Sequence, residues 1–243
     1  MDTVKVDNLN IKMIGHAGLA GLVMVNTEEG FRYAGERSYY GIETDIRKTA
    51  DGNFVCFHDP SLLASAGVDI TIENSTVAEI QEVTLFDKKG GKTKDKGYKI
   101  LTLAEYVCIC KEYGKRAFIE LKTPFTEEDV GRIIDIVAEC RYIENSTFIS
   151  FYYDNLLHVR KVLPKAKVGF TFKTAGDDVE SRFERIVSDG ISVNMSIKVV
   201  TKEWIDRFHA AGLEVTCYTI DDKETAEKLV EMGVDYIITN ILE

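Results

Sequence analysis

Short apolar runs alternate with amphipathic helical patterns along most of the chain. This alternation is typical of βα units, and eight such units favour a closed (β/α)8 barrel of the TIM type over an open sheet. The strands are predicted at residues 11–18, 40–46, 116–122, 146–151, 167–172, 191–196, 214–220 and 234–240. A further run at 53–58 is predicted to return antiparallel to the second strand.

Helix starts are indicated by capping residues ahead of the amphipathic segments. Thr76, Thr102 and Asn26 are each followed three residues later by glutamate, which is the spacing of a capping box. Thr126 and Thr201 precede acidic first turns. We therefore expect helices to begin at these five positions.

The segment 60–100 interrupts the repeat because it is too long for an ordinary βα connection. It contains a short helical pattern near 76–82 and a run at 87–97 with five lysines and three glycines. A solvated mobile loop is the more common interpretation of such a run, and a phosphate-steering lid is the alternative. The sequence predicts a single domain, 1–243, with the 60–100 insertion over the barrel mouth.

Composition and charge exclude several classes of partner. The 243 residues carry a net charge of −10 and a pI near 5.0, which argues against nucleic acid and stable association with anionic membranes. No apolar run suits a membrane span or a signal peptide, and five cysteines form no even disulfide framework. We expect reduced thiols, a cytoplasmic location and a small-molecule substrate. The sequence does not indicate an oligomeric state.

The most informative stretch is GIETDIRKTADGNFVCFHDP, at 41–60. Residues two apart share a face of a strand, so Glu43 and Asp45 are predicted to project together. The pair Asp51-Gly52 is typical of a two-residue type I′ hairpin turn. In that register the numbers of cross-strand partners sum to about 103, so His58 is predicted to lie opposite Asp45.

Further polar residues fall where predicted strands end, and the active sites of barrels lie at that face. Glu120 joins Glu43 and Asp45 as a hard oxygen donor suited to Mg²⁺ or Ca²⁺. His16 and His58 have the side chain that exchanges protons near neutrality. Each feature alone is common in solvated edges and turns. Together they are more specific, since buried acids are costly unless paired or metal-bound.

These residues resemble the glycerophosphodiester phosphodiesterase family. The shared motifs, in order, are GHAG at 15–18, Asn26-Thr27, GIETD at 41–45, the TADG turn, FHD at 57–59, IELK at 119–122, SF at 150–151 and Tyr218-Thr219. The resemblance implies a phospholipase C-like barrel that cleaves glycerophosphodiesters with a divalent cation, giving sn-glycerol 3-phosphate and an alcohol. It implies the following site residues: His16 and His58 as catalytic residues, Glu43, Asp45 and Glu120 as metal ligands, Lys122 at the phosphate and Tyr218 as an aromatic wall.

The chain departs from the family pattern near the first strand. Ala17 stands where the family usually has arginine, and Met24 and Val25 replace Pro-Glu. The missing guanidinium removes a bidentate phosphate donor. Two alternatives therefore remain at this point: a phospholipase D-like enzyme that cleaves lysophospholipid headgroups, and a catalytically silent barrel that binds phosphate esters.

Overall fold

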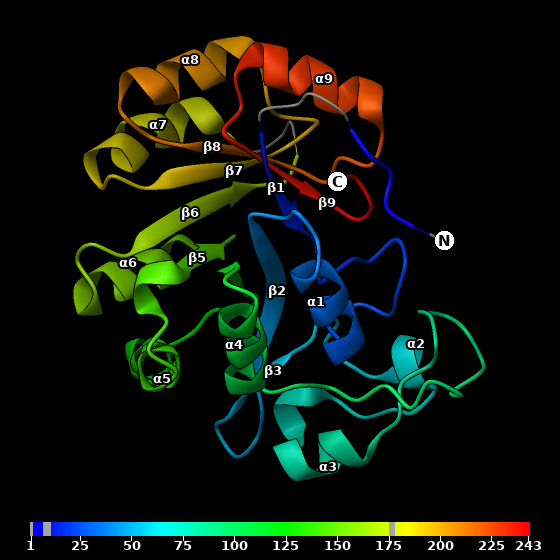
Figure 1. Cartoon of the computed structure of the whole chain (residues 1–243). Helices are drawn as coiled ribbons and strands as arrows, with labels where there is room; N and C mark the ends of the chain where they lie inside the picture. The colour runs from blue at the N-terminus through cyan, green and yellow to red at the C-terminus, as the bar shows by residue number, and fades with distance from the viewer. Residues whose placement is uncertain (1, 7–10, 175–177) are drawn as a thin grey trace.

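The protein is described here by a computed structural model that covers residues 2–6, 11–174 and 178–243. In this part of the chain, eight parallel strands form a closed barrel surrounded by helices (Figure 1). The barrel strands are β1 (Lys12–Gly15), β2 (Gly41–Lys48), β4 (Arg116–Leu121), β5 (Ser146–Ser150), β6 (Lys167–Phe172), β7 (Ser192–Ser196), β8 (Val215–Tyr218) and β9 (Tyr236–Thr239). Strand β1 pairs with both β2 and β9, which closes the barrel and confirms the predicted fold.

The helices that follow the strands cover the outside of the barrel (Figure 1). They are α1 (Glu28–Gly35), α4 (Leu103–Glu112), α5 (Glu127–Glu139), α6 (Tyr153–Val162), α7 (Val179–Ser188), α8 (Lys202–Ala210) and α9 (Lys223–Met232). A 3-10 helix, η2 (Ile143–Asn145), precedes β5. Among the described residues, no helix is both long and apolar enough to cross a lipid bilayer.

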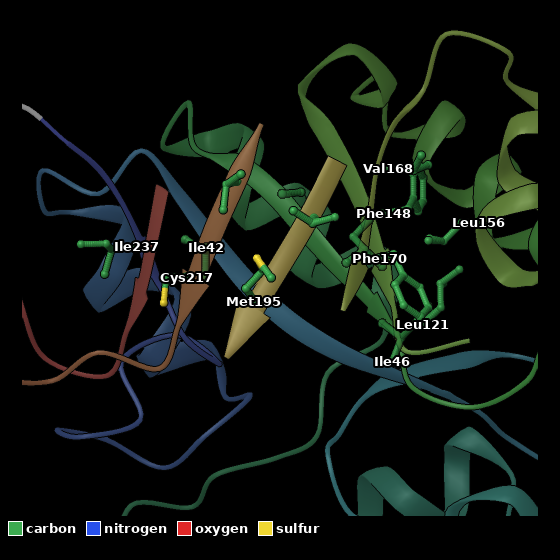
Figure 2. Close-up of a cluster of buried hydrophobic side chains, with 14 of the residues drawn as sticks. Ile42, Ile46, Leu121, Phe148, Leu156, Val168, Phe170, Met195, Cys217 and Ile237 are labelled. Carbon is green, nitrogen blue, oxygen red and sulfur yellow. The ribbon is translucent and has the colours of Figure 1, made fainter. Parts of the chain in front are cut away.

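The two faces of the barrel strands have different roles. On β2, Ile42 and Ile46 belong to the large apolar cluster between strands and helices (Figure 2). Glu43 and Asp45 alternate with these isoleucines and therefore lie on the opposite face, inside the barrel. An apolar cluster that includes Phe118 and Ile238 occupies the barrel interior. The alternation of side chains along β2 thus places two acidic residues inside the barrel, while the apolar residues on the outer face of the same strand pack in the core.

Most of the predicted helix starts are confirmed. The side chains of Thr76, Thr102 and Thr126 complete capping boxes, and Thr201 accepts a hydrogen bond from the first turn of α8. The prediction for Asn26 is wrong, because Thr27 caps α1 and accepts from Gly30 N. Asn26 has a left-handed backbone with φ of 55°. Its side chain turns into the barrel.

The predicted register of the hairpin between β2 and β3 (Phe54–Cys56) is also wrong, by one residue. Ile46 pairs with Cys56 and Arg47 with Val55, and Phe57 N donates to Asp45 O at 2.9 Å. The loop is longer than a two-residue turn because Thr49 N donates to Asn53 O and Thr49 Oγ1 caps Asn53 N. His58 follows the last paired residue, so strand alternation does not determine its orientation.

The insertion after β3 contains α2 (Leu63–Ala66), the 3-10 helix η1 (Ile72–Asn74) and α3 (Val77–Glu82), which confirms a short helix near 76–82. It has an apolar cluster of its own, which includes Phe57, Leu62, Ile72, Ile80 and Leu85. The lysine-rich run folds back on itself, since Asp87 N donates to Thr93 O. The position of the insertion, residues 60–100, over the barrel mouth remains a prediction.

Candidate active site

A cavity of about 500 Å³ lies at the carboxyl ends of the barrel strands. Such a volume suits a small organic ligand. Its lining comprises His16, Glu43, His58, Glu120, Lys122, Ile149, Phe151, Tyr152, Thr171, Lys173, Asn194, Tyr218, Thr219 and Ile238. All but one of the predicted site residues are in this set; the remaining one, Asp45, lies directly beside it and is buried.

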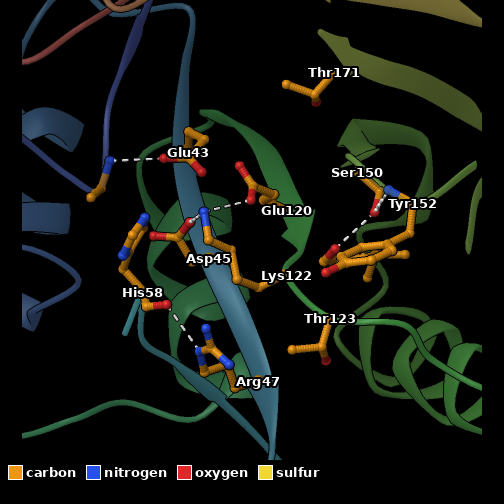
Figure 3. Close-up of polar contacts among 12 residues, drawn as sticks. Glu43, Asp45, Arg47, His58, Glu120, Lys122, Thr123, Ser150, Tyr152 and Thr171 are labelled. Atoms are coloured by element: carbon orange, nitrogen blue, oxygen red, sulfur yellow. Dashed lines mark hydrogen bonds and ion pairs between the residues drawn. The ribbon is translucent and has the colours of Figure 1, made fainter. Parts of the chain in front are cut away.

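The carboxylates of Glu43, Asp45 and Glu120 meet on one side of the cavity (Figure 3). They are buried, and one oxygen from each lies within 4.8 Å of the others. Register explains the convergence, because Asp45 on β2 pairs with Glu120 on the adjacent parallel strand β4. Adjacent strands thus bring together carboxylates that are 75 positions apart in the sequence (120 − 45).

The three carboxylates are held by different partners. Glu43 Oε2 accepts a hydrogen bond of 3.0 Å from the backbone N–H of Ala17. Asp45 Oδ2 accepts one of 3.1 Å from the amide of Asn26, whose oxygen in turn accepts from Thr44 Oγ1 at 2.8 Å. The left-handed backbone of Ala17 and Asn26 presents these donors to the carboxylates.

Lys122 lies immediately after β4 and supplies a positive charge to this cluster. Its Nζ is 2.7 Å from Glu120 Oε1 and 2.9 Å from Asp45 Oδ1 (Figure 3). The ring of Phe151 lies beside the same ammonium, with its centroid 5.7 Å from Nζ. The ammonium therefore compensates part, but not all, of the charge of three carboxylates.

Burial and mutual repulsion shift the pKa values of the cluster apart. Burial, with repulsion from Asp45 and Glu120, holds the pKa of Glu43 well above its usual range. Burial and the charge of Asp45 raise the pKa of Glu120 to about 7. Burial also acts to raise the pKa of Asp45, but Lys122 and His58 outweigh it and lower that pKa. Repulsion between carboxylates this close is relieved when a cation lies between them.

The donor set fits a divalent cation. Three buried carboxylates offer the hard oxygen ligands that Mg²⁺ and Ca²⁺ use. The position of Lys122 Nζ between Asp45 and Glu120 shows that a cation is accommodated between these two side chains. Glu43, Asp45 and Glu120 therefore form a candidate metal site.

His16 lies at the end of β1, and its imidazole borders the carboxylates. Nε2 is 3.9 Å from Glu43 Oε2, and Nδ1 is 2.7 Å from Asn240 Oδ1. The Asn240 side-chain amide donates to Asp221 Oδ2 at 2.6 Å, and its backbone N–H donates to Asp221 Oδ1 at 2.8 Å. These bonds aim the Asn240 oxygen at His16, so Nδ1 donates and Nε2 is left as the basic nitrogen.

His58 lines the same cavity from the loop after β3. Its Nδ1 is 2.7 Å from Asp59 Oδ1, and Lys89 Nζ is 2.6 Å from Asp59 Oδ2. Because a carboxylate only accepts, Nδ1 donates here as well. Both histidines therefore have the same tautomer, with Nδ1 engaged by a fixed acceptor.

The opposite side of the cavity is formed by β5 to β8. Tyr218 lines it, and its hydroxyl donates to Phe172 O at 2.9 Å. Tyr152 and Thr171 also line this side (Figure 3). Arg47, near the end of β2, donates to His58 O and pairs with Glu73.

Sequence reasoning missed several residues that hold the site. Asp221 and Asn240 were not singled out, although both follow strands of the barrel, as His16 does. The rule that residues just beyond strand ends face the active site identifies them. Asp59 lies in the FHD motif but was given no role, and Lys89 gives no comparable signal, since its contact with Asp59 depends on how the insertion folds.

Comparison with known proteins identifies the family. The sequence model of the glycerophosphoryl diester phosphodiesterase family matches residues 16–243. The chain belongs to this family. A glycerophosphodiester phosphodiesterase of Caldanaerobacter subterraneus subsp. tengcongensis is 27% identical over 94% of this chain and 93% of its own length.

Solved structures agree with this assignment. The glycerophosphodiester phosphodiesterase of Thermotoga maritima superposes with a TM-score of 0.77 at 25% identity, covering 95% of each chain. A phosphodiesterase of Oleispira antarctica, solved with the product sn-glycerol-3-phosphate, has a TM-score of 0.83 at 22% identity, covering 98% of this chain and 96% of that one. The second likeness bears on the fold alone. The family resemblance read from the motifs is thus confirmed.

Proposed function

We propose that this protein is a phosphoric diester hydrolase that converts glycerophosphodiesters to sn-glycerol 3-phosphate and an alcohol with the help of a divalent cation. The observation that carries the proposal is the arrangement of two histidines, each with Nδ1 engaged, beside three converging carboxylates. Family membership and the similarity to the glycerophosphodiester phosphodiesterase of Caldanaerobacter subterraneus subsp. tengcongensis support the same reaction.

Glu43, Asp45 and Glu120 are the proposed ligands, and Mg²⁺ or Ca²⁺ is the proposed ion because all three donors are carboxylate oxygens. When bound, the ion supplies positive charge that offsets the charge of the phosphate. Lys122 adds a second positive charge from the end of β4. Tyr218 is the proposed aromatic wall against which the substrate packs.

His16 and His58 are the proposed catalytic residues. One neutral imidazole accepts the proton of the attacking hydroxyl or water through Nε2, while the other, which must be an imidazolium with a second proton on Nε2, donates that proton to the departing alkoxide. The bond between phosphorus and the leaving oxygen breaks as the new phosphorus–oxygen bond forms. Asn240 and Asp59 keep Nε2 as the nitrogen available on each ring.

A lysophospholipid substrate is the second candidate, and one observation favours it. Tyr152, on the cavity wall, is 43% exposed, so an aromatic surface lies at the mouth where an acyl chain would leave. The catalytically silent alternative predicts no turnover of any phosphodiester.

The deciding experiment incubates purified protein with glycerophosphocholine, glycerophosphoethanolamine or lysophosphatidylcholine, each with Mg²⁺, with Ca²⁺ or with chelator, and measures released choline for the last of these substrates. sn-Glycerol 3-phosphate is measured by a coupled dehydrogenase assay, with His16→Ala as the blank. Cation-dependent release supports the proposal. Release in chelator from fully metal-free protein contradicts the metal role, and headgroup release only from lysophosphatidylcholine supports the second candidate.

We also propose that residues 1–243 act as one barrel domain with the 60–100 segment over its mouth, which the ion pair between Lys89 and Asp59 supports. A cytoplasmic location is proposed from the acidic composition and the free cysteines.

A further inference from the structure

His58 needs contacts from outside the barrel to hold its orientation. The backbone pairing of the hairpin ends at Phe57, whose N–H donates to Asp45 O. The side chain of His58 is half exposed, at 50%. An imidazole in such a position has more than one accessible rotamer unless neighbouring groups select one. His16, by contrast, follows a barrel strand directly and is held by residues at other strand ends.

The first chain of contacts reaches the ring of His58. Asp59 uses its two oxygens for different partners: Oδ1 accepts from His58 Nδ1, and Oδ2 accepts from Lys89 Nζ. The ammonium of Lys89 thus fixes the orientation of the Asp59 carboxylate, and this carboxylate in turn fixes the imidazole of His58. The pKa of Asp59 agrees, since burial would raise it but Lys89 and His58 lower it. Lys89 comes from the lysine-rich run of the insertion.

The second chain of contacts reaches the backbone of His58. Arg47 Nε donates to His58 O at 2.9 Å, and Arg47 Nη1 is 2.6 Å from Glu73 Oε1 (Figure 3 shows the first of these bonds). The Arg47 side chain is only 10% exposed, whereas that of Glu73 is 36% exposed, so solvent reaches this ion pair from the Glu73 side only. Glu73 belongs to η1, in the same insertion as Lys89.

We propose that the insertion positions His58, with Lys89 acting on the imidazole through Asp59 and Glu73 acting on the backbone through Arg47. Lys89 and Glu73 are positioning residues, since neither lines the cavity. The inference rests on the proposed function, in which His58 exchanges protons. It assigns the insertion a role in proton transfer that is separate from any contact with substrate.

Lys89 differs from its neighbours in a way that permits a matched test. Of the lysines at 87–97, all of them in the part of the chain that the structure describes, Lys89 alone forms an ion pair. Lys88 is adjacent and carries the same charge. Lys88→Met and Lys89→Met therefore change the net charge equally, and only the second removes the partner of Asp59.

In steady-state kinetics with glycerophosphocholine, Lys89→Met should lower kcat about tenfold with KM within about twofold, because displacing a group that transfers a proton costs rate more than binding. Lys89→Arg should restore most of kcat, and Lys88→Met should match the wild type. Glu73→Gln should lower kcat in the same sense as Lys89→Met. Equal kcat values for Lys88→Met and Lys89→Met would overturn the role of Lys89.

A double-mutant cycle tests the route through Asp59. In an Asp59→Asn background, Lys89→Met should change kcat by less than about twofold, since the carboxylate on which it acts is gone. A full tenfold effect in that background would show that Lys89 acts by another route, and the proposed chain of contacts would be wrong.

A readout without substrate separates this inference from the proposed function. In metal-free protein, at a pH high enough that the His58 ring is neutral, the ¹⁵N chemical shifts of the ring should show a single tautomer protonated at Nδ1 in the wild type and in Lys88→Met. Lys89→Met should show a mixture of tautomers. If no phosphodiester is turned over but the shifts behave in this way, the proposed function fails and the positioning of His58 stands. An unchanged tautomer in Lys89→Met contradicts the positioning itself.

Discussion

Nδ1 of His16 and Oδ1 of Asn240 lie 2.7 Å apart, although 224 positions separate the two residues in the sequence. Closure of the barrel brings them together, because β1 pairs with β9 and each residue immediately follows one of these strands. Asp221 then fixes Asn240 by accepting one hydrogen bond from its side-chain amide and one from its backbone N–H. The orientation of His16 is thus a consequence of the barrel closing on itself.

Removal of this amide should impair proton transfer at His16. We expect Asn240→Ala to lower kcat at least tenfold with a smaller change in KM, because the ring loses the acceptor that selects its tautomer. Asn53→Ala, in the hairpin loop, is the matched control and should retain activity. Steady-state kinetics on glycerophosphocholine measure both, and wild-type kcat in Asn240→Ala would remove Asn240 from the mechanism.

The three carboxylates should act as a unit toward a divalent cation. Glu43→Gln, Asp45→Asn and Glu120→Gln each remove one anionic donor from a cluster within 4.8 Å, so each should weaken Mg²⁺ or Ca²⁺ binding and reduce hydrolysis by about two orders of magnitude or more. Glu112→Gln, on the surface, should change neither. Isothermal titration calorimetry gives the affinity. Unaltered cation binding in all three variants would rule out the candidate metal site.

The metal-free protein should lose stability as Glu120 ionises. Its folded-state pKa of about 7 lies above the ordinary value of 4.5, so the folded protein retains a proton that the unfolded chain has lost. The associated stability is fully present below the ordinary pKa and is lost as the pH rises through about 7.

Glu120→Gln cannot ionise, so in chelator its free energy of unfolding should exceed that of the wild type by about 1–2 kcal/mol at alkaline pH. The two proteins should converge near about pH 5. Denaturant unfolding across this pH range is the measurement. Parallel curves would show that repulsion within the cluster does not limit stability.

The sequence was sufficient for the barrel and for the set of predicted site residues near the cavity. Both follow from the regular spacing of residues in strands. Strand alternation puts Glu43 and Asp45 on one face, and the parallel register places Glu120 beside Asp45. These are properties of regular structure, for which residue spacing is enough. The predicted roles of these residues remain to be tested by the experiments above.

The errors occur where regular structure ends. The turn at Asp51-Gly52 was predicted to contain two residues, but the Thr49 hydroxyl bonds Asn53 N and lengthens the loop. Strand alternation with the observed register would have placed His58 away from the cavity. It lines the cavity because pairing stops at Phe57 and contacts from the insertion determine its position. Such long-range side-chain contacts have no periodic signal in one sequence.

Lys122 should matter more here than in a family member with arginine after the first histidine. It is the cation closest to Asp45 and Glu120, and Ala17 supplies no charge. Lys122→Ala should therefore reduce kcat/KM by about two orders of magnitude, whereas Lys122→Arg should retain part of the activity. Lys111→Ala, on the surface of α4, is the control. Hydrolysis of glycerophosphocholine measures the effect, and near-wild-type kcat/KM in Lys122→Ala would exclude a role at the phosphate.

The last prediction concerns Ala17, whose methyl group stands where the family usually has a guanidinium. Ala17→Arg retains the backbone N–H that donates to Glu43, and the left-handed φ of 48° is already that of a residue with a Cβ atom. The added guanidinium group should therefore lower KM for simple glycerophosphodiesters by supplying a bidentate phosphate donor.

Ala17 is only 2% exposed, so the longer side chain must displace its neighbours, and Ala17→Met controls for this steric effect. Thermal unfolding of both variants separates misfolding from altered binding. A lower KM in Ala17→Arg but not in Ala17→Met supports the interpretation that the substrate phosphate lacks one charged partner in the natural protein. If instead both folded variants lose activity on the best substrate, that substrate occupies the space beside Ala17. A lysophospholipid would then become the stronger candidate, because a larger substrate accounts for a small residue at this position.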